Sequence, residues 1–304
     1  MFTNVLVGVD GQANARDAIA LASRLIDARG ELTLAHVHPG ALNPTHAVTP
    51  GRVREEQQAS DGLLEAERAQ ADVRAALASV SALSPGRGLH EQAERQGADL
   101  LVVGSSSRGL LGRAMLGDDT RSALNGAPCA VAIAARGYSE APKPFATIGV
   151  GYNHSPESRG ALAVARQVAP ASRARVVALN VVSLPTYTFA GLMTPMLGES
   201  IESLLQEENA RLAEFSGVDG RAVYGLAGEE LAEFGDEVDL LVVGSRSYGP
   251  WRRLVLGSTS NYLQRHARCS LLVLPRVDAQ EGDDPAPPRA AASDQTLTSP
   301  RSSA

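Results

Sequence analysis

Aromatic residues and positive charge are both scarce in this sequence. Phe, Trp and Tyr make up only 4% of the 304 residues, although hydrophobic residues reach 44%. The core must therefore be built mainly from Ala, Leu and Val. The formal net charge is −6 and no sustained basic run occurs. This argues against nucleic acid or an anionic membrane as the main partner, because both are bound largely through Lys and Arg.

Long apolar runs, a basic leader and a cysteine framework are lacking as well. No apolar run approaches the ~18 residues that a membrane-spanning helix needs. The chain passes at once into the apolar residues 5–9, without the basic start of a signal peptide. The two cysteines, Cys129 and Cys269, suit buried strand positions better than a disulfide or metal pair. We therefore expect a cytoplasmic protein without a membrane partner or a metal centre.

What the sequence does contain is a long internal repeat. Residues 100–105, Leu-Leu-Val-Val-Gly-Ser, recur unchanged at 240–245, and Cys129 recurs as Cys269, so both pairs are 140 positions apart. Such a repeat is a whole duplicated domain, because solenoid units span only about 20–50 residues. We predict a first domain at 1–136, a linker at 137–146, a second domain at 147–276 and a disordered tail at 277–304.

Apolar runs and helical periodicities alternate along both halves. In the first half we predict strands at 5–9, 32–37, 98–104 and 129–134, with helices around 18–25 and 54–78. In the second half we predict strands at 148–151, 175–182, 221–224, 238–244 and 270–274, and helices from Ser155, at 198–215 and at 227–235. This alternation is typical of a parallel sheet covered by helices on both faces. We expect two α/β domains, each with a five-stranded parallel sheet.

Two strand ends in each half carry residues suited to hold a ligand, and ligands of open parallel sheets bind at the carboxyl ends of strands. The paired positions are Asp10 and Asn153 after the first strand, Gly104 and Gly244 at the end of the fourth, and Gly117 and Gly257 where the next loop returns. Glycine lets the backbone approach a ligand, and N–H groups at a helix start can donate to phosphate. These positions predict a phosphate-containing ligand.

With these motifs, the sequence resembles the universal stress protein family in its tandem two-domain form. Nucleotide-binding members of that family carry Gly-x-x-Gly, then nine residues, then Gly-Ser or Gly-Thr. The second half matches as Gly244-Ser245-Arg246-Ser247, nine residues, Gly257-Ser258; the first half matches as Gly104-Ser105-Ser106-Ser107, nine residues, Gly117-Asp118. The spacing is intact twice, and both copies have Ser in place of the second Gly.

The resemblance implies further details of fold and ligand. It implies strand order 3-2-1-4-5 in each half, an intramolecular pseudo-dimer formed through the last strands, and leaves a homodimer of whole chains open. It implies ATP as the ligand, with Mg²⁺ as a companion ion. It also implies an acid after the first strand, where Asp10 and Asn153 lie, and a backbone contact to the base at Val37 and Val181. Arg246 can either clamp phosphates or lie on the solvated face of its loop.

The two halves depart from the family pattern in opposite ways. The first half keeps Asp10 but has Asp118 where a phosphate-binding hydroxyl is expected, whereas the second keeps Ser258 and Thr259 but has Asn153. A carboxylate 4 Å from a phosphate charge costs about 1–4 kcal/mol, while Asn for Asp costs about 1 kcal/mol. We therefore predict that the second half holds the nucleotide. A metal bridging Asp118 to phosphate would reverse this order.

We predict an ATP-binding sensor or regulator of the stress response rather than an efficient enzyme. Neither glycine loop contains lysine, and no Walker loop or Ser-His-Asp order occurs, although slow ATP hydrolysis stays open. The alternative is a nucleotide-free interaction scaffold of the same fold, decided by whether Ser247 keeps the backbone of the family's second Gly. A related adenylating ligase is a weaker alternative, because no Ser-Gly-Gly-x-Asp-Ser loop follows the first strand.

Overall fold

A computed structural model describes residues 1–39, 50–105, 125–183, 195–245, 254 and 256–275. The first half contains β1 (Phe2–Gly8), α1 (Ala13–Leu25), β2 (Ile26–His38), α2 (Pro50–Ala71), β3 (Ala76–Ser81), α3 (Pro85–Gln96), β4 (Leu100–Gly104) and β5 (Ala130–Ala134). The second half contains β6 (Thr147–Gly151), α5 (Pro156–Ser172), β7 (Arg175–Val182), α6 (Pro195–Ala213), β8 (Asp219–Tyr224), α7 (Ala227–Phe234), a 3-10 turn (Gly235–Glu237), β9 (Leu240–Gly244), α8 (Ser258–His266) and β10 (Ser270–Leu274).

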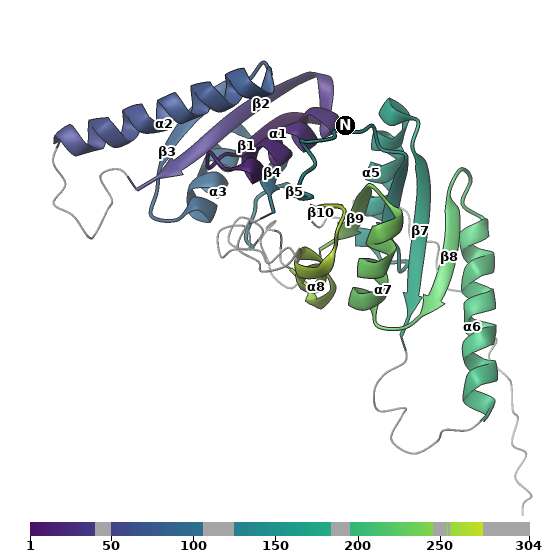
Figure 1. The fold of residues 1–304 in the computed structure, drawn as a ribbon. Helices are drawn as coiled ribbons and strands as arrows, with labels where there is room; N and C mark the ends of the chain where they lie inside the picture. Colours follow the sequence, from purple (N-terminus) through teal and green to yellow (C-terminus); the bar gives the residue numbers. More distant parts are fainter. Residues whose placement is uncertain (40–49, 106–124, 184–194, 246–253, 255, 276–304) are drawn as a thin grey trace, which may run out of the picture.

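All ten strands form one sheet (Figure 1), in the order β3-β2-β1-β4-β5-β10-β9-β6-β7-β8. Within each half neighbouring strands are parallel, so the predicted order 3-2-1-4-5 is confirmed twice. The halves meet where β5 and β10 pair antiparallel, with Leu272 opposite Ala132. The Ser270 hydroxyl, fully buried, accepts a hydrogen bond from the Ala135 amide at 3.2 Å. The strands of the two halves therefore run in opposite directions, and their carboxyl ends lie on opposite sides of the molecule.

Helices cover both faces of the sheet, and each face has a continuous apolar core that draws residues from both halves. One cluster takes buried residues from α1, α2, α5 and α6, namely Ile19, Leu64, Val168 and Leu212 among others. The other takes them from α3, α7 and α8, namely Ala93, Phe234 and Leu263 among others. The core is dominated by Leu, Val and Ala, as the shortage of aromatic residues predicts. None of the helices in the described ranges is long and apolar enough to cross a membrane.

The two cysteines directly precede the strands that join the halves. Cys129 is buried and Cys269 is partly buried, and both are free thiols. Burial raises the pKa of each thiol to about 12, so neither is ionised near neutral pH. The two cysteines are unpaired as predicted, but each lies one residue before its strand and only Cys129 is buried.

The predicted end of α2 is wrong, and β3 and α3 of the first half were not predicted. The helix predicted at 54–78 ends at residue 71, and residues 76–78 belong to β3. β3 is short, partly buried and rich in Ala and Ser, so it lacks a strong apolar signal. Helix α3 contains Gly86 and Gly88, which disfavour helix in sequence terms. Gly88 is explained by packing, because a Cβ there would lie 2.7 Å from the Val37 side chain.

The segment predicted as a linker, 137–146, is fastened to the first half. The Asp17 carboxylate, on α1, is only 2% exposed. It accepts hydrogen bonds from the Gly137 amide at 2.9 Å and from both the amide and the hydroxyl of Ser139, at 2.7 and 2.6 Å. Phe145 is almost fully buried in the core. The connection between the halves is therefore an ordered part of the fold. The tail predicted at 277–304 lies outside the described residues.

Candidate functional site

The turn after the first strand is built alike in both halves despite the change from acid to amide. Asp10 accepts a hydrogen bond from the Gln12 amide at 3.0 Å. Asn153 accepts one from the Ser155 amide at 3.2 Å. Each oxygen thus closes a short turn that starts the next helix, which is a common use of Asp and Asn side chains. The replacement of the acid by Asn153 therefore preserves the local backbone and changes only the charge.

The glycines at the ends of β4 and β9 are required by the packing of the following helix start. A Cβ at Gly104 would lie 2.2 Å from the carbonyl oxygen of Asn14, in the first turn of α1. A Cβ at Gly244 would lie 2.5 Å from Cβ of Glu157, in the first turn of α5. Contacts this short do not occur between real Cβ atoms and their neighbours. Glycine at these positions lets a helix N-terminus approach the strand end, whether or not a ligand is bound.

Helix α8 begins at the predicted phosphate position of the second half. Its N-cap residue is Gly257, in an extended conformation (φ −76°, ψ 175°) with no side chain to cap the helix. The Gly257 carbonyl accepts the first intrahelical bond, from the Asn261 amide at 2.9 Å. The amides of Ser258 and Thr259 have no intrahelical acceptor, as in the first turn of any α-helix. They carry the partial positive charge that attracts anions to helix N-termini.

A cavity of about 550 Å³ lies at the carboxyl ends of β6, β7 and β9. Six predicted site residues line it: Asn153, Val181, Gly244, Ser245, Gly257 and Thr259. An apolar wall is supplied by Leu179, Val181, Leu231 and Val243. Hydroxyl groups come from Ser155, Ser158, Ser183 and Ser260. Its size lies within the ~300–1,000 Å³ typical of sites for small molecules and cofactors.

The corresponding cavity of the first half is smaller, about 110 Å³, as bounded by described residues. Asp10, Val37 and Gly104 line it, together with Asn14 and His36. The side-chain Oδ1 of Asn14 and the Ser105 hydroxyl are buried without a hydrogen-bond partner. The predicted residue Gly117 lies outside the described residues, as do Arg246 and Ser247 of the second half. The structure therefore brings together most of the predicted positions in each half.

The comparisons with known proteins agree with this architecture. The profile of the Universal stress protein family matches residues 1–135 and 144–275. The chain belongs to the universal stress protein family. The two matches correspond to the duplicated halves, so it is a tandem member of that family. No curated protein matches the sequence.

Several solved structures are similar to this chain. A universal stress protein from Archaeoglobus fulgidus DSM 4304 has a TM-score of 0.62 and 16% identity, covering 89% of this chain and 97% of that one. A functionally unknown protein from Pseudomonas aeruginosa PAO1 has a TM-score of 0.61 and 16% identity, covering 90% and 92%. A universal stress protein solved in complex with cAMP is 28% identical over 43% of this chain and 98% of that one, with a TM-score of 0.29. At such identities the first two show a shared fold.

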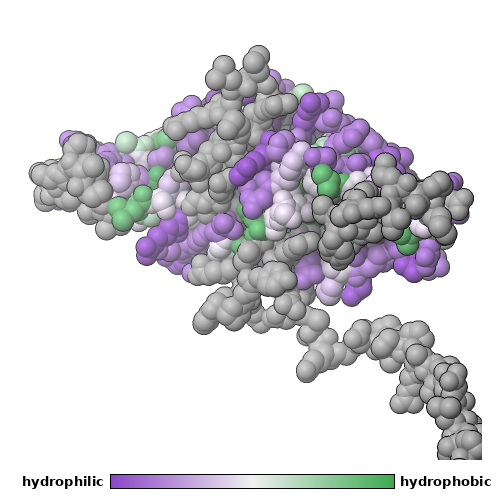
Figure 2. All heavy atoms as spheres, turned by 90° about the horizontal axis from the view of Figure 1, so that it is seen from below, coloured by the Kyte–Doolittle hydropathy of each residue, from purple (hydrophilic) through white to green (hydrophobic). Residues whose placement is uncertain are grey.

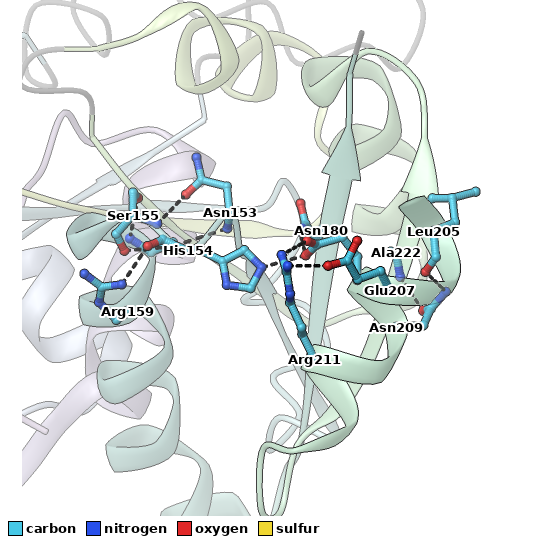
Figure 3. A network of polar contacts seen from close by, with 12 residues as sticks. Asn153, His154, Ser155, Arg159, Asn180, Leu205, Glu207, Asn209, Arg211 and Ala222 are labelled. Atoms are coloured by element: carbon cyan, nitrogen blue, oxygen red, sulfur yellow. Dashed lines mark hydrogen bonds and ion pairs between the residues drawn. The ribbon is translucent and has the colours of Figure 1, made fainter. Parts of the chain in front are cut away.

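A polar network that the sequence analysis did not identify supports the turn at Asn153 (Figure 3). The neighbouring residue, His154, has a left-handed backbone (φ 62°), which is uncommon for residues other than glycine. Its Nε2 lies 2.6 Å from Oε2 of Glu208 on α6, and the Asn180 amide donates to the same oxygen at 2.8 Å. Arg211 donates to Oε1 of Glu208 at 2.6 Å. The network ties the β6–α5 turn to helix α6.

In the first half a glycine occupies the same position, so no side chain extends from it toward α2. The equivalent residue is Gly11, with φ 74°, and a Cβ there would lie 3.0 Å from the Leu63 side chain on α2. A glycine facing a leucine thus stands where the second half has His154 facing Glu208.

The pKa of Glu208 reflects two opposing effects. Burial raises it, but the hydrogen bond and charge of His154, the Arg211 charge and the Asn180 amide outweigh the effect of burial. The net effect is a pKa below the ordinary 4.5.

Glu208→Gln is expected to lower the free energy of unfolding at pH 7 by about 1–3 kcal/mol, since His154 and Arg211 lose a partly buried charged acceptor. Because the folded-state pKa of Glu208 is lowered, its contribution is complete above pH ~4.5 and is lost as pH falls through the lower folded value. The difference between the variant and the unsubstituted protein should therefore shrink as the pH falls below ~4.5. Urea unfolding across this pH range measures it, with Glu202→Gln on the exposed face of α6 as control. A gap that stays constant with pH would contradict the assignment.

The face toward which β7 and β8 run is seen in Figure 2. Its coloured residues are mostly hydrophilic, and hydrophobic ones occur in small, separate areas. The coloured part of this face therefore presents mainly polar groups and no broad apolar surface. Apolar side chains line only part of the cavity, which suits a ligand with one apolar and one polar end.

Proposed function

We propose that this chain binds ATP in the cavity of its second half and acts as a sensor or regulator of the stress response. The observation that carries the proposal is the convergence of Asn153, Val181, Gly257 and Thr259 on one 550 Å³ cavity at the start of α8. The cavity has an apolar wall and a region of backbone amides and hydroxyls. A nucleotide has the matching division between a flat base and an anionic phosphate chain.

The orientation of the nucleotide follows from this division. We place the base against Val181 and Leu231, where β7 and α7 supply apolar surface, and the phosphates at Gly257 and Thr259, where α8 begins. Helix N-termini favour anions by roughly 0.3–1 kcal/mol at exposed sites and more when partly buried. Among the described residues that line the cavity, Glu157 is the one with a carboxylate. Carboxylate oxygen suits Mg²⁺, so we expect Glu157 to face the ion that accompanies ATP.

The pairing of the halves fits the same proposal. β5 and β10 join the two five-stranded halves into one sheet, and each face has a core shared by both halves. We propose that one chain corresponds to a pseudo-dimer of two family domains. A homodimer of whole chains is a further proposal, which sedimentation of the purified protein tests.

Titration of Mg²⁺-ATP into the nucleotide-stripped protein is expected to show about one equivalent bound per chain. Isothermal titration calorimetry gives the stoichiometry, after mass analysis of any nucleotide that co-purifies. ADP and cAMP are titrated under the same conditions, because they carry fewer phosphates than ATP to contact the start of α8. Two equivalents would show that the first half also binds. Absence of heat, with no co-purified nucleotide, would favour an interaction scaffold of the same fold.

A further inference from the structure

A short segment of the first half is hydrogen-bonded to the end of the glycine loop of the second half. The Gly126 amide donates to the Leu254 carbonyl at 2.9 Å, and the Leu254 amide donates to the Ala127 carbonyl at 2.9 Å. The Leu256 amide lies 3.5 Å from Oδ1 of Asn125. Residues 125–127 thus act toward Leu254 as a neighbouring strand does, although the two segments belong to different halves.

Leu254 is also fixed through its side chain. It is fully buried, in the same apolar cluster as Ala127 and Ile133 of the first half. It precedes Gly257, the N-cap of α8, by only three residues. Only two residues separate Leu254 from Gly257, and each spans at most about 3.6 Å, so a larger displacement of Leu254 has to move Gly257. The first half therefore contacts the second half close to the start of α8.

The backbone of residue 126 depends on glycine. Gly126 has φ 88°, in the region that residues with a Cβ adopt only with strain. Space is not the constraint, because a Cβ there would have the His90 ring as its nearest neighbour at 3.7 Å, an ordinary contact. A substitution at Gly126 therefore acts on backbone conformation, and through the two hydrogen bonds on Leu254.

We infer that residues 125–127 are a positioning element of the site in the second half, so that this site is complete only when the first half holds its loop. The nucleotide part of this inference rests on the proposed function, whereas the structural coupling stands on the hydrogen bonds alone. Coupling of this kind is reciprocal in equilibrium terms. A nucleotide bound at α8 should thus stabilise residues 125–127, which lead directly into β5.

Gly126→Ala tests the inference, with Gly97→Ala as the matched control. Gly97 is also in the first half and also has positive φ (64°), and a Cβ there would meet nothing within 4 Å. Both variants impose the same kind of strain, but only residue 126 is bonded to Leu254. We expect Gly126→Ala to speed hydrogen exchange of residues 254–257 and to weaken Mg²⁺-ATP binding about fivefold or more. Gly97→Ala should change neither the hydrogen exchange of residues 254–257 nor the affinity for Mg²⁺-ATP, even if it lowers the melting temperature as much as Gly126→Ala does.

Gly126→Asn provides a rescue, because Asn tolerates a left-handed backbone better than Ala. It should restore both the exchange rates and the affinity most of the way toward those of the unsubstituted protein. Equal exchange of residues 254–257 in the Gly126→Ala and Gly97→Ala proteins would overturn the inference. If the unsubstituted protein binds no ATP, the proposed function fails, but the exchange comparison still decides whether the first half holds the loop.

Discussion

Replacing Gly257 with aspartate is expected to abolish measurable Mg²⁺-ATP binding in the second half while leaving the protein folded. Gly257 has an extended backbone (φ −76°, ψ 175°), which any residue adopts without strain. Aspartate is among the best N-cap residues, because its carboxylate accepts hydrogen bonds from the amides of the first turn. In this variant the side chain would occupy the amides at α8 that we assign to the phosphates. It would also add a negative charge next to them.

The charge effect alone sets a minimum for the loss of affinity. A carboxylate about 4 Å from a phosphate charge is repulsive by about 1–4 kcal/mol, which is roughly 5- to 800-fold in Kd. Gly257→Ala is the control, since it adds bulk without a charge or a hydrogen-bond acceptor. Calorimetric titration gives the affinities, and thermal unfolding without nucleotide should show an unchanged or higher melting temperature for the aspartate variant. Unaltered ATP affinity in this variant would move the site away from α8.

The parts of the site that the sequence predicted are those defined by short local patterns. A buried strand that ends in glycine and leads into a loop of fixed length predicts β9, Gly244 and Gly257 without knowledge of the rest. Strand periodicity likewise predicts β7 from 175 to 182, and the structure has the same bounds. These signals are local because a parallel strand is buried on both faces and therefore appears as a continuous apolar run.

The parts that could not be predicted depend on contacts between distant segments. His154 meets Glu208 from 54 residues away, and nothing in either local sequence indicates the pair. Gly126 meets Leu254 across the two halves. One signal was available but unused, because Ser84-Pro85 repeats the Ser155-Pro156 helix start of the second half. Ser84 does cap α3 by accepting a hydrogen bond from the Arg87 amide at 3.4 Å.

The interpretation of a glycine at a strand end also changes once the structure is known. From the sequence, Gly104 and Gly244 are expected to let the backbone approach a ligand. In the structure, each already faces the first turn of a helix at a distance that excludes a side chain. Such glycines are therefore indicators of the fold, and they would be needed even in a member of the family that binds no nucleotide. Ligand binding has to be argued from Gly257 and the cavity instead.

Gly104→Ala is accordingly expected to be among the most destabilising single-methyl changes in the first half. The new Cβ would lie 2.2 Å from the Asn14 carbonyl oxygen, which belongs to the backbone and can move only if α1 moves. Overpacking of this kind costs about 1–3 kcal/mol and occasionally more. For a chain of this size, a loss of about 3 kcal/mol lowers the melting temperature by roughly 5–6 °C. Differential scanning calorimetry measures both quantities.

Gly62→Ala is the matched control, because the same change at this position should stabilise the protein. Gly62 is exposed in the interior of α2, and a Cβ there would meet nothing within 4 Å. Alanine in a helix interior is about 0.5–1 kcal/mol more favourable than glycine. The two variants should therefore shift the melting temperature in opposite directions. A small or absent loss for Gly104→Ala would mean that α1 can withdraw from β4 at little cost, and the glycine would then have to be explained by a ligand after all.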